Sequence, residues 1–183
     1  MTTREEEIAK YVQCYKDPAY KMGDRRRRHI QWALERIDGG SLLDVSTGRG
    51  ETLDMAAGLG FFPVHGTEAV PYLCNDNVTH ALAHDLPFAD NSFCTVTMFD
   101  VMEHLLRQDT EAVCKELQRV ASKRVLLTVH NGPSRHGKVA LHINRRDSYR
   151  DWHEELQSYF DGDVVWLDNQ NSISEMFEVT LRP

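Results

Sequence analysis

The chain has 183 residues, 41% of them hydrophobic, which suits one domain with a sizeable core and is too short for two ordinary domains. No apolar run approaches the roughly 20 residues that cross a bilayer, and residues 1–7 lack the pattern of a secretory signal, so we expect a cytoplasmic protein. The formal net charge of −7 argues against general affinity for extended duplex nucleic acid. The four cysteines are widely spaced, which indicates reduced thiols rather than disulfides or a zinc site.

Two helices are expected before the first strand. Ile8, Tyr11 and Tyr15 share one helical face, which predicts an amphipathic helix over residues 5–16. A second helix is expected over residues 25–37, after the start signal Gly23-Asp24.

Four consecutive arginines, Arg25 to Arg28, occupy the first turn of that second helix. The helix dipole disfavours cations there, so they do not serve helix stability. They form either a solvated basic face or a clamp for an anionic group of a substrate. In the second interpretation Arg25 and Arg28 bind the substrate.

Residues 41–52 predict a strand, a tight loop and the start of a helix. Gly48 and Gly50 allow a ligand to approach the backbone closely, and free N–H groups at the helix start point into the loop. This pattern is typical of a nucleotide cradle, although an ordinary strand-to-helix turn has it too. A second strand, residues 62–68, ends in Glu68, a carboxylate that can accept hydrogen bonds from both ribose hydroxyls.

The remaining chain continues the alternation of strands and helices. We expect strands over 77–81, 94–99 and 124–129, and a helix over 109–121, hence a parallel sheet with helices on both faces. A helix over 149–159 and two strands, 164–167 and 175–181, follow. The polar turn 168–171 joins these two strands, so the sheet should end in an antiparallel hairpin.

Four segments together resemble class I S-adenosylmethionine-dependent methyltransferases: the turn 44–50, Glu68, the run 86–93 (LPFADNSF) and the run 101–105 (VMEHL). The resemblance implies an α/β fold with a doubly wound, Rossmann-like sheet of seven strands, mostly parallel, with an antiparallel terminal hairpin. It implies a single domain over 1–183, in which the core 41–183 binds the cofactor and the helices within 1–40 form part of a substrate lid.

The resemblance also implies which residues bind S-adenosylmethionine. The loop surrounds the methionine part and the sugar, Glu68 binds the ribose, and the segment at Leu82 lies by the adenine. The implied residues are Asp44, Ser46, Thr47, Gly48, Gly50, Glu68, Leu82, Ala83, His84 and Phe99. The chain departs from the family pattern at Ser46, where a glycine is usual, and at Leu82 and Cys94, where acids are frequent.

Methyl transfer from a sulfonium depends mainly on positioning and electrostatics, so few residues need to react. The carboxyl edge of the sheet is where such folds bind substrates. Catalytic candidates at this edge follow the fourth and fifth strands: Asp100, Glu103, His104 and His130. Substrate-binding candidates come from the next loop, whose segment 131–137 is either a mobile lid or an ordinary surface loop: Asn131, His136 and His142.

Asp100, Glu103 and His104 also suggest a site for a divalent ion, Mg²⁺ or Mn²⁺, that polarises a hydroxyl nucleophile. The spacing resembles the Glu-x-x-Glu-His site of metal-dependent O-methyltransferases, including small-RNA 2′-O-methyltransferases, with Asp in the first position. The spacing leaves open whether a histidine of the later loops completes the site. Two alternatives stand beside it: His104 as a general base without metal, and a Glu-His pair that only packs locally.

Three functions follow from these patterns. The first is a methyltransferase acting on a small or nucleotide-like, anionic acceptor, with an RNA or nucleotide hydroxyl included. The second is a catalytically inactive partner subunit that keeps the fold. The third is a nicotinamide dehydrogenase, which ranks last because the third glycine of the dinucleotide motif is missing.

Overall fold

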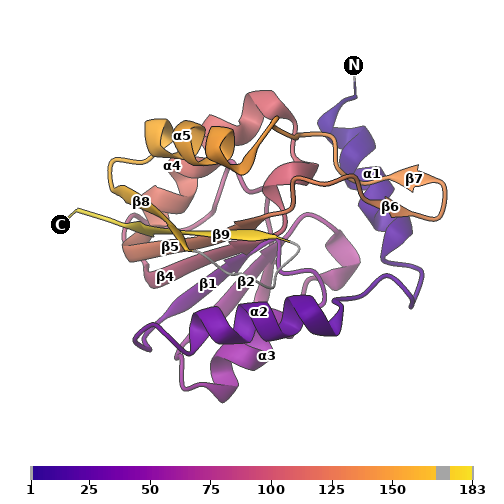
Figure 1. Ribbon diagram of the computed structural model, residues 1–183. Coiled ribbons are helices and arrows are strands. Elements are labelled where there is room, and N and C mark those ends of the chain that lie inside the picture. Colours follow the sequence, from indigo (N-terminus) through magenta and orange to yellow (C-terminus); the bar gives the residue numbers. More distant parts are fainter. Residues whose placement is uncertain (1, 168–173, 183) are drawn as a thin grey trace.

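A seven-stranded sheet forms the centre of the computed structural model, which describes residues 2–167 and 174–182 (Figure 1). The strand order is β3-β2-β1-β4-β5-β9-β8. The strands of this sheet are β1 (Leu42–Val45), β2 (Val64–Glu68), β3 (Val78–His80), β4 (Phe93–Phe99), β5 (Ala121–Val129), β8 (Asp163–Leu167) and β9 (Glu175–Thr180).

The directions of the strands confirm the predicted fold class. β1 pairs in parallel with β2 and β4, β2 with β3, and β4 with β5. β9 runs antiparallel to both of its neighbours, β5 and β8. The sheet therefore ends in the expected antiparallel hairpin. The polar turn expected at 168–171 lies outside the described residues.

Helices cover both faces of the sheet (Figure 1). On one face, α4 (Thr110–Val120) and α5 (Tyr149–Tyr159) pack on a hydrophobic cluster that includes Leu117, Trp152 and Phe177. On the other face, α2 (Asp24–Leu34) and α3 (Glu51–Gly58) pack on a second cluster. Burying each large apolar side chain contributes about 1.5–3 kcal/mol, so these two clusters hold all four helices on the sheet.

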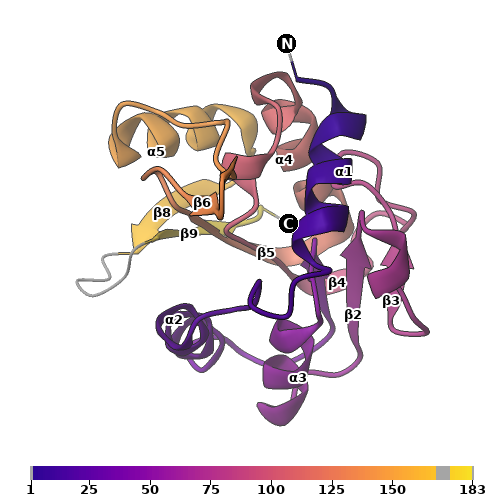
Figure 2. The same ribbon diagram turned by 90° about the vertical axis from the view of Figure 1, so that its right-hand side faces the viewer.

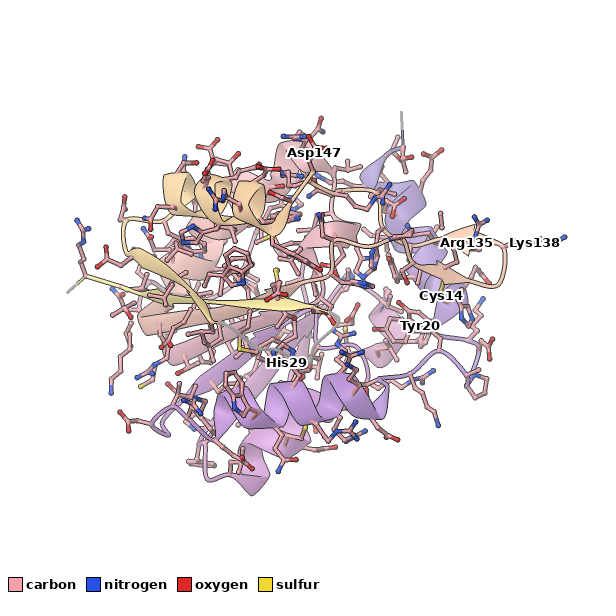
Figure 3. All side chains as sticks on the ribbon, in the orientation of Figure 1. Cys14, Tyr20, His29, Arg135, Lys138 and Asp147 are labelled. Atoms are coloured by element: carbon pink, nitrogen blue, oxygen red, sulfur yellow. The ribbon has the colours of Figure 1, made fainter. Side chains whose placement is uncertain are left out.

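The carboxyl ends of the parallel strands face a separate group of elements (Figure 2). Helix α1 (Arg4–Cys14) crosses this edge of the sheet. A small hairpin, β6 (Arg135–His136) and β7 (Val139–Ala140), stands beside it, within the segment that the sequence predicted as a polar loop. Figure 3 shows Arg135 and Lys138 at the outer end of this hairpin, pointing away from the sheet.

Short 3-10 helices complete the chain: η1 (Pro71–Leu73), η2 (Met102–His104) and η3 (Arg107–Asp109). η2 carries the predicted Glu-His pair directly after β4. Over the described residues, none of the helices combines the length and the apolar character needed to cross a membrane.

Candidate active site

The loop after β1 has the backbone geometry of a ligand cradle. Gly48 and Gly50 adopt left-handed conformations with φ of 60° and 82°, and Gly50 is the N-cap of α3. Ser46 also lies in this region, with φ of 60°. A side chain makes this conformation unfavourable, which explains why a glycine suits the position, but a small serine can still adopt it.

Two buried acids flank this loop, and neutral groups hold both. The Thr97 hydroxyl donates to Asp44 Oδ1 at 2.6 Å, and burial raises the pKa of Asp44 from 3.8 to about 6. The backbone N–H of Gly48 donates to Glu68 Oε2 at 2.8 Å, and that of Val70 donates to Oε1 at 3.0 Å. Burial raises the pKa of Glu68 as well. Each Glu68 oxygen keeps a lone pair for a further donor.

Two cavities adjoin the loop, and tyrosines of the N-terminal segment lie between them. The larger cavity, of about 270 Å³, is lined by Gly48 and Asp44. The smaller one, of about 140 Å³, is lined by Glu68. Both cavities share six lining residues: Tyr15, Tyr20, Arg26, Ser46, Asp100 and His104. A ligand that spans both cavities therefore passes these six residues.

Asp100 follows β4 and forms an ion pair at the shared wall. It adopts a left-handed conformation with φ of 53°. Arg26 Nε lies 3.0 Å from Asp100 Oδ2, and the Thr128 hydroxyl donates to Oδ1 at 2.7 Å. Burial acts to raise the pKa of Asp100, but Arg26 and Thr128 outweigh it, so the pKa lies below its usual value. Asp100 is thus a carboxylate whose charge Arg26 already compensates.

Glu103 is completely buried at the base of the larger cavity. The backbone N–H of His130 donates to its Oε1 at 3.0 Å. Its Oε2 has no hydrogen-bond partner among the described residues. Burial, reinforced by Asp100, raises the pKa of Glu103 well above the usual value. This oxygen is available to a ligand.

His104 and His142 present unprotonated ring nitrogens. His104 Nδ1 lies 2.6 Å from the Tyr11 hydroxyl and 3.2 Å from the Leu141 carbonyl, and His142 Nδ1 lies 2.6 Å from the Gly132 carbonyl. A carbonyl only accepts, so His142 Nδ1 carries the proton and His142 Nε2 keeps a lone pair. The Leu141 carbonyl also accepts from the Tyr11 hydroxyl at 3.3 Å, so His104 is held through Nδ1 in either tautomer. Burial lowers the pKa of His104 to about 3, so its ring is neutral.

Glu103, His104 and His142 offer ligand atoms that all lie within 4.8 Å of one another. His130 stands beside them, with its ring 4.9 Å from that of His142. Asp100 is not part of this group, because it is paired with Arg26. The structure thus places two of the three proposed metal ligands together and adds His142, which sequence spacing had left among several alternatives.

Several predicted site residues lie elsewhere. The lining residues described for the two cavities include Arg25, Phe99, His130 and His142 but not the following: Arg28, Leu82, Ala83, His84, Asn131 and His136. Asn131 instead bonds to the Arg146 backbone and accepts from Trp152 Nε1 at 3.1 Å. His136 bonds to Asp17, and Ala83 is buried in the core. Arg28 is exposed on α2, because the helical turn directs Arg26 rather than Arg28 to the site.

The sequence interpretation missed four residues at the shared wall or beside it: Tyr11, Tyr15, Tyr20 and Arg26. Tyr11 and Tyr15 were expected as packing residues of an amphipathic helix. Their spacing predicts a shared face correctly, but it does not distinguish a core from a cavity. Arg26 belongs to the arginine run that was singled out, and a helical projection of that run is the signal that would have found it.

Comparisons with known proteins agree with this geometry. Residues 43–129 match a family model described as a methyltransferase domain. Over these residues the chain carries a methyltransferase domain. The matched residues include the glycine loop, Glu68 and the turn after β4.

Solved structures share the fold of this methyltransferase domain at low sequence identity. The 1,6-didemethyltoxoflavin-N1-methyltransferase of Burkholderia thailandensis, solved with 1,6-didemethyltoxoflavin and S-adenosylhomocysteine, is 12% identical with a TM-score of 0.77, covering 100% of this chain and 92% of that chain. PH0226 of Pyrococcus horikoshii is 16% identical (TM-score 0.70; 94% and 99% covered). The methyltransferase domain of bacterial CtHen1-CN is 16% identical (TM-score 0.65; 88% and 100% covered). No curated protein sequence matches the chain significantly.

Proposed function

We propose that the chain transfers a methyl group from S-adenosylmethionine to a small or nucleotide-like, anionic acceptor. The observation that carries this proposal is the meeting of the two cavities at His104, Asp100 and Ser46. Glu68 lies on one side of this junction and the glycine loop on the other. A cofactor that reaches both has its middle part beside the imidazole of His104.

The residues around the junction fit S-adenosylmethionine. Glu68 offers two carboxylate oxygens to ribose hydroxyls, and Gly48 leaves its backbone uncovered by a side chain of its own. The buried Thr47 hydroxyl has no hydrogen-bond partner among the described residues, so a polar ligand group would satisfy it. Asp44 adds a buried carboxyl to the same cavity. When bound, S-adenosylmethionine supplies an electrophilic methyl group on a sulfonium.

The charge and size of the larger cavity support the choice of acceptor. Lys21, Arg25 and Arg26 line it, and Arg26 is already paired with Asp100. Lys21 and Arg25 are exposed and add positive charge to the wall of this cavity, which suits an anionic group such as a carboxylate or phosphate. A volume of about 270 Å³ that also takes the methionine part of the cofactor leaves room for a small molecule or one nucleotide end.

His104 is the residue that would remove a proton from the acceptor. Its Nδ1 is held by Tyr11 and the Leu141 carbonyl, and the tautomer with the proton on Nδ1 leaves a lone pair on Nε2. As a hydroxyl or amine of the acceptor forms its bond to the methyl carbon, the methyl–sulfur bond of the sulfonium would break with its electron pair going to sulfur, and the acceptor proton would pass to Nε2. The step adds no net charge, because the positive charge that the sulfonium loses appears on His104, beside the Arg26–Asp100 ion pair.

Calorimetric titration with S-adenosylmethionine and S-adenosylhomocysteine, with NAD as the control, tests cofactor binding. Transfer of a labelled methyl group is then measured with nucleotides, short RNAs and small carboxylates. Binding of the adenosyl ligands with turnover of an anionic acceptor supports the proposal. Binding without turnover of any acceptor favours an inactive partner subunit, and binding of NAD alone contradicts the proposal.

A second candidate is metal-assisted methylation of a hydroxyl, such as the 2′-hydroxyl at an RNA end. Glu103, His104 and His142 favour it because their ligand atoms lie within 4.8 Å of one another. Backbone carbonyls lie within hydrogen-bond distance of Nδ1 in both histidines, the arrangement that orients metal-binding imidazoles. Glu103 Oε2 has no hydrogen-bond partner in the described chain. Bound Mg²⁺ or Mn²⁺ would polarise the acceptor hydroxyl at this group.

Titration with Mn²⁺ separates the two candidates. The metal-assisted candidate expects Mn²⁺ binding that His142→Ala abolishes and His136→Ala leaves unchanged, since His136 lies on the outer hairpin bonded to Asp17. It also expects EDTA to stop turnover. Turnover that continues in EDTA assigns the chemistry to His104 without metal.

A further inference from the structure

His104 and His142 both line the larger cavity, but they belong to segments that are far apart in the chain. Their ring centroids lie 4.8 Å apart. His104 ends η2, which follows β4, and His142 belongs to the segment after β7. Because neither residue lies in a strand of the sheet, the pairing of the strands does not fix the distance between the two imidazoles. Contacts between the two segments must fix it.

Hydrogen bonds of Asn144 and its neighbour join these two segments. The backbone N–H groups of Ile143 and Asn144 both donate to the Glu103 carbonyl, at 2.9 and 3.0 Å. The side-chain Nδ2 of Asn144 donates to the Met102 carbonyl at 2.9 Å. Asn144 is thus bonded to two successive carbonyl groups, those of the two residues that precede His104.

Asn144 is buried, and every polar atom of its side chain has a partner. Its exposed fraction is 1%. Nδ2 also donates to the Thr110 hydroxyl at 3.2 Å, and Oδ1 accepts from Arg146 Nη1 at 2.6 Å. An arginine only donates and a carbonyl only accepts, so the amide has a single orientation. An aspartate has the same shape without the two donors, and a leucine has neither donor nor acceptor, so these bonds require asparagine.

Arg146 connects this amide to α5. Both carboxylate oxygens of Glu155 accept from its guanidinium, with Nη2 lying 2.7 Å from Oε1. The guanidinium also lies over the ring of Trp152, 4.2 Å from its centroid. Trp152 is fully buried in the hydrophobic cluster beneath α4 and α5. Asn144 is therefore anchored, through one arginine, to a helix that packs on the sheet.

Asn131 closes the base of the same loop. Its Oδ1 accepts from the Arg146 backbone N–H at 2.9 Å, and its Nδ2 donates to the Arg146 carbonyl at 2.7 Å. The amide thus pairs with both backbone groups of Arg146, as a neighbouring strand would. Within the loop, His142 Nδ1 donates to the Gly132 carbonyl at 2.6 Å. The two ends of segment 131–146 are held together, and His142 is bonded inside it.

We propose that Asn144 is a positioning residue for methyl transfer, because it sets the separation of the His104 and His142 imidazoles. This rests on the proposed function, which supplies the acceptor that these imidazoles face. Arg146 and Asn131 anchor Asn144 to α5. Segment 131–137, for which the sequence left open a mobile lid or an ordinary surface loop, is then one side of a fixed frame that carries His142 into the site.

Long-range proton–nitrogen NMR spectra of the free protein test the placement of His142, because they report which ring nitrogen carries the proton. The wild type should show His142 protonated on Nδ1, with the signal identified by its loss in His142→Ala. Asn144→Asp keeps the shape of the side chain but removes both donors. His142 should then lose its bond to Gly132 and show a mixture of tautomers. An unchanged His142 signal in folded Asn144→Asp overturns the proposal.

Asn75→Asp is the matched control for the change of amide to carboxylate. Asn75 is exposed in the turn before β3, and its Oδ1 accepts from the Asn77 N–H, a bond that an aspartate also makes. Its spectrum should therefore match the wild type at His142. If Asn144→Asp does not fold, Asn131→Asp takes its place, because it removes only the bond to the Arg146 carbonyl. A mixture of His142 tautomers in that variant supports the proposal, and an unchanged signal overturns it.

Methyl-transfer kinetics test the role in the reaction. With an acceptor that the wild type methylates, Asn144→Asp should lower kcat at least several-fold, because the rate depends on how the reacting groups are positioned. KM for S-adenosylmethionine should stay unchanged, since Asn144 lines neither of the two cavities described. An unchanged kcat, or a rise of KM alone, overturns the positioning role. If calorimetry shows no binding of S-adenosylhomocysteine, the proposed function fails, and the NMR spectra of the free protein still decide whether Asn144 places His142.

Discussion

The turns after β1 and β4 lie side by side at the carboxyl edge of the sheet, but their acidic side chains bond to different kinds of group. Each turn contains a non-glycine residue with positive φ, Ser46 in one and Asp100 in the other. Around the first turn, Asp44 and Glu68 bond to a threonine hydroxyl and to backbone amides, which are neutral. In the second turn, Asp100 is paired with Arg26.

This difference separates binding from chemistry. The partners of Asp44 and Glu68 are neutral, so no protein cation compensates these two carboxylates. Their negative charge suits the hydroxyl groups and the positive charge of the proposed cofactor. In the second turn the arginine compensates Asp100, and the open lone pairs belong to His104 and His142. Under the proposed function, the first turn would bind the cofactor, and the second would hold neutral histidines beside the acceptor.

The strongest way to break the comparison is to fill the first turn. Gly48→Val adds a side chain at φ of 60°, where its Cβ would lie 2.4 Å from the Tyr15 hydroxyl oxygen. We expect complete loss of S-adenosylhomocysteine binding by calorimetry, because the new side chain occupies the cofactor's approach to the loop. Gly58→Val is the matched control, since a Cβ at Gly58 meets no atom within 4 Å, and it should bind normally. Unchanged affinity in the Gly48 variant would place the cofactor elsewhere.

Asp44 tests whether burying a carboxyl group beside neutral partners lowers the unfolding free energy. Its pKa rises from 3.8 to about 6 in the folded state, so its contribution is full below pH 4 and is lost as the pH rises to about 6. This rise of the Asp44 pKa corresponds to about 3 kcal/mol of unfolding free energy. Asp44→Asn removes the titration. Chemical denaturation should show the unfolding free energy of the wild type falling by about that amount relative to the variant between pH 4 and pH 7. A difference that does not vary with pH would contradict a buried, uncompensated carboxyl.

Glu68 tests the binding role of the same region. Glu68→Ala removes two carboxylate oxygens from the smaller cavity and should weaken S-adenosylhomocysteine binding by about 1–3 kcal/mol. Glu111→Ala removes an exposed carboxylate on α4 and is the control for the change in net charge. Calorimetry on both variants measures the effect. Equal affinities would show that the ribose does not use Glu68.

The sequence predicts a turn well where the residues that contact one another are close together in the chain, and poorly where they are far apart. Local periodicity predicts α5 to the residue, and the glycine loop follows from the neighbouring positions 44–50. The same reasoning places the start of β5 at residue 124 rather than Ala121, because apolar patterning begins only there. The β6–β7 hairpin was missed, since its strands have two residues each and carry no period.

The turn after β4 was predicted only in part, because the residues that contact it are far away in the sequence. The sequence names its residues as candidates, and the structure shows that their contacts depend on groups far along the chain. Arg26 comes from α2, Tyr11 from α1 and His142 from the segment after β7. Because of these long-range contacts, Asp100, which the sequence proposed as a metal ligand, forms an ion pair with Arg26. No spacing within residues 100–104 contains that information.

The substitution with the smallest expected effect is Arg26→Lys, which tests why the turn after β4 differs from the turn after β1. Arg26→Lys keeps the positive charge near Asp100 but removes the forked guanidinium, which also donates to the Phe99 carbonyl. We expect a loss of about 1 kcal/mol in unfolding free energy, the value of one hydrogen bond. Arg28→Lys makes the same substitution at an exposed position on α2 and should leave stability unchanged. If the two variants unfold alike, the charge of Arg26 suffices, and the contrast between the turns depends on charge alone rather than on geometry.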